Sequence, residues 1–265
     1  MKKIGFIGCG NMAKAIIGGI VGKNVMAPGD IIASNRSRKA LDYAEETWGI
    51  SVTADNLEVA KEAEIVVLAV KPQFYGQVIG EIKGAVQESQ LIMSIAPGKT
   101  LAWMEEQFGR PLKFIRCNPN TPAMVGEGIT SVTPGDKVTE TELARVTEIL
   151  ESFGKASVVS EAMIEAVIAV SGSAPAYAFM FMEAMADGAV SLGMPRAQAY
   201  EFAAQAVLGA AKMVLETGLH PGALKDMVCS PGGTTIQAVR VLEERGLRSS
   251  VIEAMIACAD KARSM

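Results

Sequence analysis

Short apolar runs alternate with helical patterns along the first 160 residues. Runs with the length and composition of strands lie at residues 4–7, 31–34, 64–70, 91–95, 114–116, 129–132 and 156–159. The run at 64–70 is almost continuously apolar, which is typical of a strand buried on both faces of a parallel sheet. The run at 129–132 is expected at a sheet edge. Because helical patterns at 38–48, 101–108 and 139–153 separate the runs, the sequence predicts an α/β domain with a doubly wound sheet.

The pattern changes near residue 161. Strand-like runs disappear, and helices are expected at residues 162–170, 174–192, 196–217, 221–228, 234–245 and 247–263. The sequence therefore predicts two domains, an α/β domain over residues 1–160 and an all-α domain over residues 161–265.

Apolar side chains cover more than one face of the helix expected at 174–192, namely Tyr177, Phe179, Met180, Phe181, Met182 and Met185. Helices that are apolar all round are buried, but a domain of about a hundred residues has little outer shell to bury them. We infer that the all-α domain dimerises; a well-buried monomer core is the alternative. The tract at 162–185 contains two glutamates and is interrupted around Pro175, which favours a buried helix pair over a membrane span.

The first strand leads into a glycine-rich turn and then directly into a helix. Gly8, Gly10 and Ala13 have the spacing G-x-G-x-x-A. In this context the pattern is the fingerprint of a Rossmann-type dinucleotide-binding domain, because Gly10 lets the backbone approach a pyrophosphate and the helix N-terminus attracts its charge. Glycine-rich turns also occur where no nucleotide binds. The expected cofactor contacts are Ile7, Gly8, Cys9, Gly10, Asn11 and Met12.

The end of the second strand indicates which dinucleotide is bound. NAD-binding domains usually place Asp or Glu there, but this chain has Ser34, Asn35, Arg36, Ser37 and Arg38. A guanidinium group pairs well with a 2′-phosphate. NADPH is therefore the expected cofactor, bound through Ser34 to Ser37, and use of NADH stays open. The alternative interpretation is a solvated basic turn.

Polar residues follow other strands at the same expected edge. The run at 64–70 ends in Ala69, Val70, Lys71 and Pro72, where open α/β sheets bind their ligands; Lys71 faces either the cofactor or solvent. Asn56 is either a cofactor contact or an N-cap of a short helix. The segment at 116–123 forms a turn fixed by two prolines, whose polar side chains could bond a ligand; a plain connecting loop is the alternative.

A second glycine-rich helix start lies in the all-α domain, at Ser230-Pro231-Gly232-Gly233-Thr234-Thr235. Its two glycines let backbone N–H groups approach an anion, and a helix follows at once. The loop suits a substrate carboxylate, with hydroxyl donors at Ser230, Thr234 and Thr235. The alternative is an ordinary helix entry.

Composition narrows the classes of function. The net charge of −4 argues against nucleic acid or an anionic membrane surface as a partner. Four scattered cysteines and the single His220 predict neither a metal site nor a disulfide framework, and they favour a cytoplasmic location. A structural role is expected for His220, which precedes a proline at a helix start. Enzymes that oxidise alcohols generally need a base near the carbinol, and the sequence offers no clear candidate for such a base. This favours hydride delivery to an already polarised carbon, such as that of a cyclic imine.

These motifs together resemble the pyrroline-5-carboxylate reductase family. The resemblance runs nearly end to end and is most specific at His220-Pro221, Leu224-Lys225-Asp226 and Ser230–Ile236. It implies an N-terminal Rossmann domain, a helical dimerisation domain, and a homodimer that often forms a ring of dimers. It also implies NADPH-dependent reduction of 1-pyrroline-5-carboxylate to L-proline, the last step of proline biosynthesis.

The same resemblance implies roles for particular residues. Backbone N–H groups of Gly233, Thr234 and Thr235 would hold the substrate carboxylate, and the Thr235 hydroxyl would bond the ring nitrogen. Ser230 would shape the pocket, so Thr235 and Ser230 are the expected catalytic residues. Asn56 and the segment from Ala69 to Pro72 match cofactor-contacting positions.

The chain departs from the family pattern at Asn118, usually apolar, and at Ala174, often Gly; both bear on substrate preference. Two alternatives stay open: a related imine or 3-hydroxyacid reductase on the same fold, and a non-enzymatic NADP-sensing protein. The 3-hydroxyacid enzymes normally carry a catalytic Lys, which residues 171–176 lack. A sensor would have no use for the polar loop at 230–235.

Overall fold

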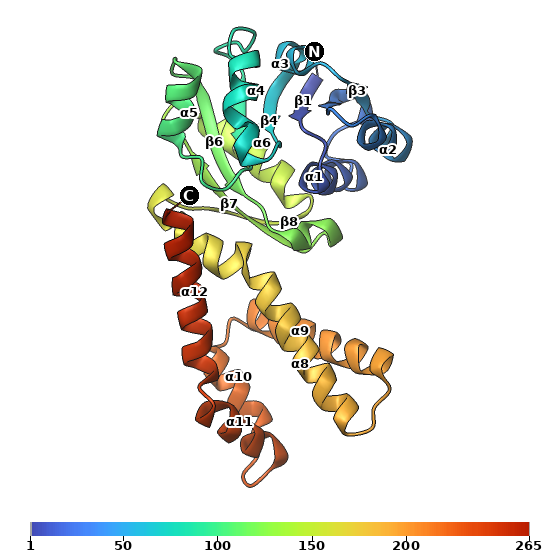
Figure 1. Cartoon of the computed structure of the whole chain (residues 1–265), viewed down its shortest axis with the longest axis vertical. Coiled ribbons are helices and arrows are strands. Elements are labelled where there is room, and N and C mark those ends of the chain that lie inside the picture. Colours follow the sequence, from blue (N-terminus) through green and yellow to red (C-terminus); the bar gives the residue numbers. More distant parts are fainter. Residues whose placement is uncertain (1, 265) are drawn as a thin grey trace. The chain divides into compact units, whose positions relative to one another are not determined.

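The computed structural model describes residues 2–264, which form two compact units (Figure 1). The first unit extends to Gly172 and includes the C-terminal residues from Ala259; the second is Ser173–Cys258. The first unit thus runs beyond residue 160, because the helical turns of residues 161–172 group with the sheet.

A single eight-stranded sheet is the middle layer of the first unit, in the order β3-β2-β1-β4-β5-β6-β7-β8. Strands β1 to β6 are parallel, whereas β7 is antiparallel to β6 and parallel to β8. The strands are β1 (Lys2–Ile7), β2 (Ile31–Ser34), β3 (Ser51–Thr53), β4 (Ala63–Leu68), β5 (Leu91–Ser94), β6 (Lys113–Asn118), β7 (Gly128–Pro134) and β8 (Gly154–Val158). The α-helices of the connections are α1 (Asn11–Gly22), α2 (Arg38–Trp48), α3 (Asn56–Glu62), α4 (Tyr75–Ile82), α5 (Leu101–Phe108), α6 (Glu140–Glu151) and α7 (Ile164–Val167). The 3-10 and π turns are η1 (Pro28–Asp30), η2 (Pro72–Phe74), η3 (Thr121–Val125), η4 (Glu161–Met163) and η5 (Ile168–Gly172).

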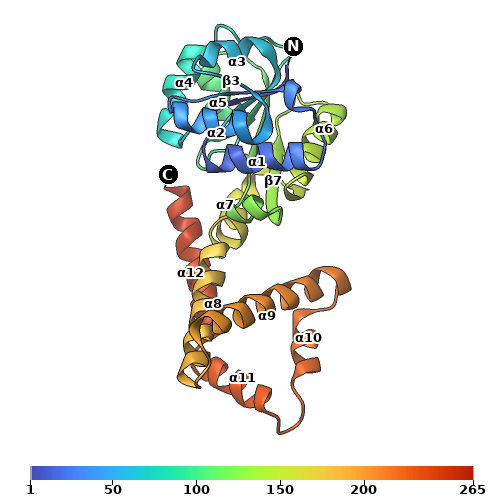
Figure 2. The ribbon, with the colours of Figure 1, turned by 90° about the vertical axis from the view of Figure 1, so that its right-hand side faces the viewer.

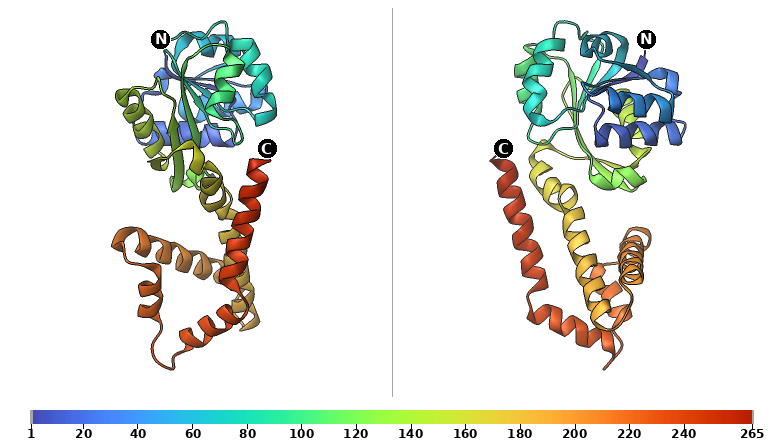
Figure 3. Two further views of the ribbon diagram at one scale, coloured as in Figure 1. Left: turned by 90° about the vertical axis from the view of Figure 1, so that its left-hand side faces the viewer. Right: turned by 45° about the vertical axis from the view of Figure 1, so that its right-hand side comes forward.

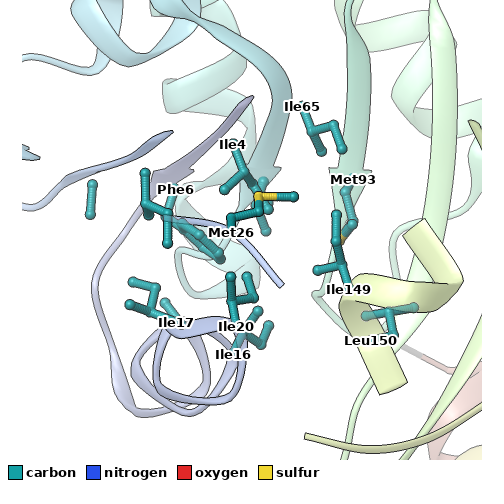
Figure 4. Packing of buried hydrophobic residues seen from close by; sticks show 14 of the residues in the cluster. Ile4, Phe6, Ile16, Ile17, Ile20, Met26, Ile65, Met93, Ile149 and Leu150 are labelled. Carbon is teal, nitrogen blue, oxygen red and sulfur yellow. The ribbon is translucent and has the colours of Figure 1, made fainter. Parts of the chain in front are cut away.

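Alternate residues of the central strands build two separate cores, one on each face of the sheet. In β4, Ile65 and Val67 face the core formed with α1, α2 and α6, and Val66 and Leu68 face the core formed with α3, α4 and α5. Figure 4 shows the first of these cores, where Ile4 and Phe6 of β1 lie over Ile17 and Ile20 of α1. The two-sided burial explains why these strands lack polar alternation in the sequence.

Some expected elements differ in the structure. The strand at 129–132 is not at the edge, because β7 pairs with both β6 and β8; its polar Thr130 and Ser131 are buried. Strand β3 and helix α4 were not predicted, since β3 has three residues and α4 contains Gly76 and Gly80, which disfavour helices. The helix expected at 162–170 is instead a 3-10 turn, a short α-helix and a π-helix.

One ion pair ties the turns after β8 to the sheet unit. Glu161 accepts hydrogen bonds from the Arg116 guanidinium at 2.9 Å and from the backbone N–H of Leu101 at 3.0 Å. The Arg116 side chain is only 5% exposed, so its charge depends on this carboxylate for compensation.

The second unit consists of helices and buries little of its own apolar surface. It contains α8 (Ala174–Ser191), α9 (Arg196–Thr217), α10 (Pro221–Val228), α11 (Thr234–Glu244) and most of α12 (Leu247–Arg263). Helices α8 and α9 pack against each other (Figures 1 and 3), and α10 and α11 follow through open loops (Figure 2). Within residues 173–258 the buried apolar side chains are Ala186, Ala199, Ala203 and Leu224, whereas Phe179 is 61% and Met180 69% exposed.

The helical stretch Glu161–Ser191 is long and apolar enough, by length and composition alone, to cross a membrane. Within the described residues, no three His, Cys, Asp or Glu side chains gather as a metal site would require.

Candidate functional site

The turn after β1 can be built only with glycine. Gly8 has φ +102°, and a Cβ on it would lie 2.7 Å from the carbonyl oxygen of Ala69. The Gly8 N–H donates to the Ser34 carbonyl and the Ala69 N–H to the Ile7 carbonyl, both at 2.9 Å. The ends of β1, β2 and β4 are therefore held together at one edge of the sheet, the carboxyl edge where such sheets bind ligands.

Helix α1 begins at this edge with an N-terminus suited to a pyrophosphate. Its N-cap is Gly10, no side chain caps it, and no acidic residue lies in its first turn. A Cβ on Gly10 would meet no atom within 4 Å, so the backbone is open to a ligand. The free N–H groups and the helix dipole favour an anion here. The cradle therefore fits the phosphates of a dinucleotide.

The side chains of Ile7 and Cys9 point into the protein. Both residues are buried, and burial raises the pKa of the Cys9 thiol. These two predicted cofactor residues therefore offer only their backbone groups, while Asn11 is exposed and Met12 partly exposed.

The basic segment after β2 contains two arginines in different situations. Arg38 is paired with Asp42 at 2.6 Å and with Glu45 at 3.4 Å along α2. Arg36 is exposed and stacks on the ring of Phe74, 4.6 Å from its centroid. Arg36 is thus the guanidinium that is available to a 2′-phosphate.

The other predicted residues of this segment also differ in whether their side chains are buried or exposed. Ser34 is fully buried and donates to the Asn56 amide oxygen at 2.7 Å, so its hydroxyl braces the fold and does not face a ligand. Asn35 accepts from the Cys9 N–H at 3.5 Å, which joins the two loops. Ser37 is exposed at the start of α2.

Asn56 is the first residue of α3, but it is not the cap. Asp55 caps the helix by accepting from the Leu57 N–H at 2.8 Å. The Asn56 amide group donates to Glu81 of α4 at 3.0 Å. Sequence reasoning did not identify Glu81, because α4 itself was not predicted.

A buried tyrosine, Tyr75, holds the end of β4 just before the segment from Ala69 to Pro72. Tyr75 donates from its hydroxyl to the Leu68 carbonyl at 2.5 Å and receives a hydrogen bond from Ser94 at 3.2 Å. Burial raises the pKa of Tyr75 to about 12, so it stays protonated as a donor. Lys71 is exposed and begins the turn η2. Tyr75 was missed because an isolated aromatic residue gives no sequence signal.

The turn after β6 contains two asparagines with different partners. Asn118 donates to the Ser131 hydroxyl at 3.4 Å across the β6–β7 pair, so its amide has a polar neighbour on the adjacent strand. Asn120 is buried, and both ends of its amide are hydrogen-bonded.

The loop from Ser230 to Thr235 belongs to the second unit and repeats the geometry of the first cradle. Gly232 has φ +69°, and Gly233 is the N-cap of α11, again with no capping side chain and no acidic residue in the first turn. A Cβ on Gly233 would overlap the Ser230 hydroxyl. Thr235 is partly exposed and Ser230 and Thr234 are exposed, which leaves hydroxyl groups beside an N-terminus that favours anions.

His220 has the structural role that its position predicts. It is the N-cap of α10, and its Nδ1 accepts from the Gly222 N–H at 3.0 Å. This bond needs an unprotonated Nδ1.

Comparisons with known proteins agree over the whole chain. The family model for pyrroline-5-carboxylate reductase dimerisation matches residues 161–265, and that for NADP oxidoreductase, coenzyme F420-dependent, matches residues 3–98. Pyrroline-5-carboxylate reductase of Escherichia coli K12 is 54% identical over 264 residues, covering 100% of this chain and 98% of the relative. The corresponding enzyme of Methanosarcina acetivorans is 41% identical, with coverages of 100% and 98%.

Solved structures show the same kinship. Pyrroline-5-carboxylate reductase of Coxiella burnetii superposes with a TM-score of 0.94 at 39% identity, covering 99% of this chain and 98% of that one. The Plasmodium falciparum pyrroline carboxylate reductase with NADP bound has a TM-score of 0.89 at 30% identity, with coverages of 99% and 97%. The chain belongs to the pyrroline-5-carboxylate reductase family.

Proposed function

We propose that this protein reduces 1-pyrroline-5-carboxylate to L-proline with NADPH, the final step of proline biosynthesis. The observation that carries the proposal is the pair of uncapped glycine helix starts, at Gly10 and at Gly233, within a chain of this family. The first suits the cofactor pyrophosphate and the second suits a substrate carboxylate.

The residues of the chain bind and orient the reactants. Backbone N–H groups from Gly10 to Met12 would hold the phosphates, and Arg36 would hold the 2′-phosphate of NADPH. Backbone N–H groups of Gly233, Thr234 and Thr235 would hold the substrate carboxylate beside Ser230. When bound, NADPH supplies the hydride.

The reaction converts the C=N bond of the ring to a C–N single bond. The imine carbon gains a hydride and the ring nitrogen gains a proton, which comes from solvent or through the Thr235 hydroxyl hydrogen-bonded to it. None of these roles requires a titrating side chain, since orientation and fixed dipoles can lower a barrier by several kcal/mol.

The second unit supports a homodimer in this proposal. Its apolar side chains, including Phe179 and Met180, lie exposed in the single chain, and the dimerisation family model covers the unit. We therefore assign the apolar face of Glu161–Ser191 to a second copy and not to lipid. The proposal also includes a ring of dimers and a cytoplasmic location. It includes no nucleic-acid partner and no membrane partner.

The proposed reaction is tested by following NADPH absorbance after addition of 1-pyrroline-5-carboxylate to the purified protein. We expect rapid NADPH oxidation with formation of L-proline, and slower oxidation of NADH in a parallel sample. NADPH binding without oxidation would contradict the proposal and would favour another imine substrate or a sensor.

Thr235→Ala removes one hydrogen bond to the reacting ring. We expect kcat to fall about tenfold or more, because one hydrogen bond contributes about 1–1.5 kcal/mol and 1.36 kcal/mol corresponds to a factor of ten. Thr235→Ser retains the hydroxyl and should retain most of the activity. If both variants turn over like the unmodified enzyme, Thr235 has no part in the reaction.

Arg36→Ala should raise the KM for NADPH about tenfold or more and leave the KM for NADH within twofold, since only NADPH has the 2′-phosphate that Arg36 would pair with. Arg38→Ala is the matched control, because Arg38 is already paired with Asp42 and Glu45. Equal effects of the two substitutions on NADPH would show that Arg36 does not read the phosphate.

Gly8→Ala and Gly10→Ala separate folding from cofactor binding. Gly8→Ala forces a side chain into positive φ against the Ala69 carbonyl and should reduce the free energy of unfolding by about 2 kcal/mol or more. Gly10→Ala meets no neighbouring atom and should leave the melting temperature unchanged while weakening NADPH binding. Normal NADPH affinity in Gly10→Ala would argue against a pyrophosphate at this turn.

A further inference from the structure

Phe74 lies at the carboxyl edge of the sheet, far in sequence from the basic segment that indicates the dinucleotide. It ends the turn η2 after β4 and is partly buried. The Arg36 guanidinium carbon lies 4.6 Å from the centroid of the Phe74 ring, within the range of a cation–π contact. Because β1 lies between β2 and β4 in the sheet, this contact joins the two loops that flank the glycine-rich turn after β1.

The backbone that carries the Phe74 ring is held in place on both sides. Pro72 restricts the start of η2, and the Phe74 N–H donates to the Lys71 carbonyl at 2.9 Å. The next residue, Tyr75, is fully buried and donates from its hydroxyl to the Leu68 carbonyl at 2.5 Å. The ring is therefore positioned by the sheet unit itself, before any ligand binds.

The Arg36 guanidinium depends on this ring for its position. Within residues 2–264 no hydrogen bond or ion pair involves it, whereas the neighbouring Arg38 is paired with Asp42 and Glu45. An exposed arginine without a partner samples many rotamers, and it loses that freedom when it binds a phosphate. The contact with Phe74 restricts the Arg36 side chain in advance.

An aromatic ring can hold a guanidinium group without using its hydrogen-bond donors. The ring contacts the cation through its π face, and the five N–H groups of Arg36 stay available to a phosphate. A carboxylate partner, such as the one that pairs with Arg38, would occupy the same donors that a phosphate needs. Phe74 therefore leaves Arg36 both restrained and free to bind an anion.

We propose that Phe74 is a positioning residue through which the protein selects NADPH over NADH. By restraining the Arg36 guanidinium, it lowers the conformational cost of binding the 2′-phosphate, which NADH lacks. Phe74 acts through Arg36 and has no need to touch the phosphate. This inference rests on the proposed function, in which Arg36 pairs with that phosphate.

Phe74→Leu tests the proposal in the full-length protein. Leucine keeps an apolar side chain at this position but has no aromatic face. We expect the Kd for NADPH, measured by titration calorimetry, to rise about threefold to fivefold, the scale of one exposed cation–π contact. The Kd for NADH should stay the same, which also shows that the variant is folded. Phe74→Tyr retains the ring and should retain the affinity for NADPH.

A double-mutant cycle with Arg36→Ala shows whether the ring acts through the guanidinium. In the Arg36→Ala background, Phe74→Leu should cause no further rise in the Kd for NADPH. A further rise as large as that in the unmodified background would overturn the proposal. Equal losses of affinity for NADPH and NADH would also overturn it, because they would assign Phe74 a general structural role. So would normal NADPH binding by Phe74→Leu.

Nucleotide fragments separate this inference from the proposed function. If the unmodified protein binds NADPH without reducing 1-pyrroline-5-carboxylate, the proposed reaction fails. Binding of 2′,5′-ADP, compared with 5′-AMP, still reports whether Phe74 supports recognition of the 2′-phosphate. Phe74→Leu should weaken binding of 2′,5′-ADP about threefold to fivefold and leave that of 5′-AMP unchanged. Equal effects on the two nucleotides, with normal reduction by the unmodified enzyme, would remove the role of Phe74 alone.

Discussion

In the first unit, a sheet buried on both faces leaves one edge for polar groups that could contact a ligand. Strands such as β4 present apolar side chains to two cores. A ligand can therefore reach polar groups of the sheet only where the parallel strands end. At that edge the ends of β1, β2 and β4 approach so closely that Gly8 admits no Cβ. The same constraint exposes the N-terminus of α1, and the buried Ser34 and Tyr75 serve as braces for loops that a cofactor would contact.

The helical unit follows a different rule, because it cannot bury its apolar surface alone. Full burial of one Phe or Met side chain contributes about 1.5–3 kcal/mol, and several such side chains are largely exposed in the single chain. A unit of this kind gains its core from association. The loop at Ser230–Thr235, which we propose binds the substrate, lies in this unit, so under the proposed function assembly and substrate binding would be coupled.

The sequence predicted the features that have a periodic or spacing signal and missed those that depend on tertiary contacts. Alternating strands and helices, the G-x-G-x-x-A turn and the glycine helix start at 232–233 were recognisable because the backbone itself demands those residues. The prediction that residues 129–132 form an edge strand was wrong, because β7 pairs with both β6 and β8. Polar residues such as Thr130, which favoured an edge in the sequence, are buried there. The different states of Arg36 and Arg38, and the links Asn56–Glu81 and Asn120–Ser171, arise between residues distant in sequence. No local pattern encodes such pairs.

Under the proposed function, the distribution of polar groups gives the protein the tasks of binding and aligning the reactants. Under the proposed function both anions of the reaction, the pyrophosphate and the substrate carboxylate, would meet helix N-termini whose N–H groups are fixed before binding, so little reorganisation would be needed on binding. An imine carbon is already electrophilic once its nitrogen is protonated or hydrogen-bonded, which leaves alignment as the main task of the protein. Just before the second unit begins, Pro175 lacks the N–H that a regular helix would offer to the Ser171 carbonyl, and the Asn120 amide donates to that carbonyl instead.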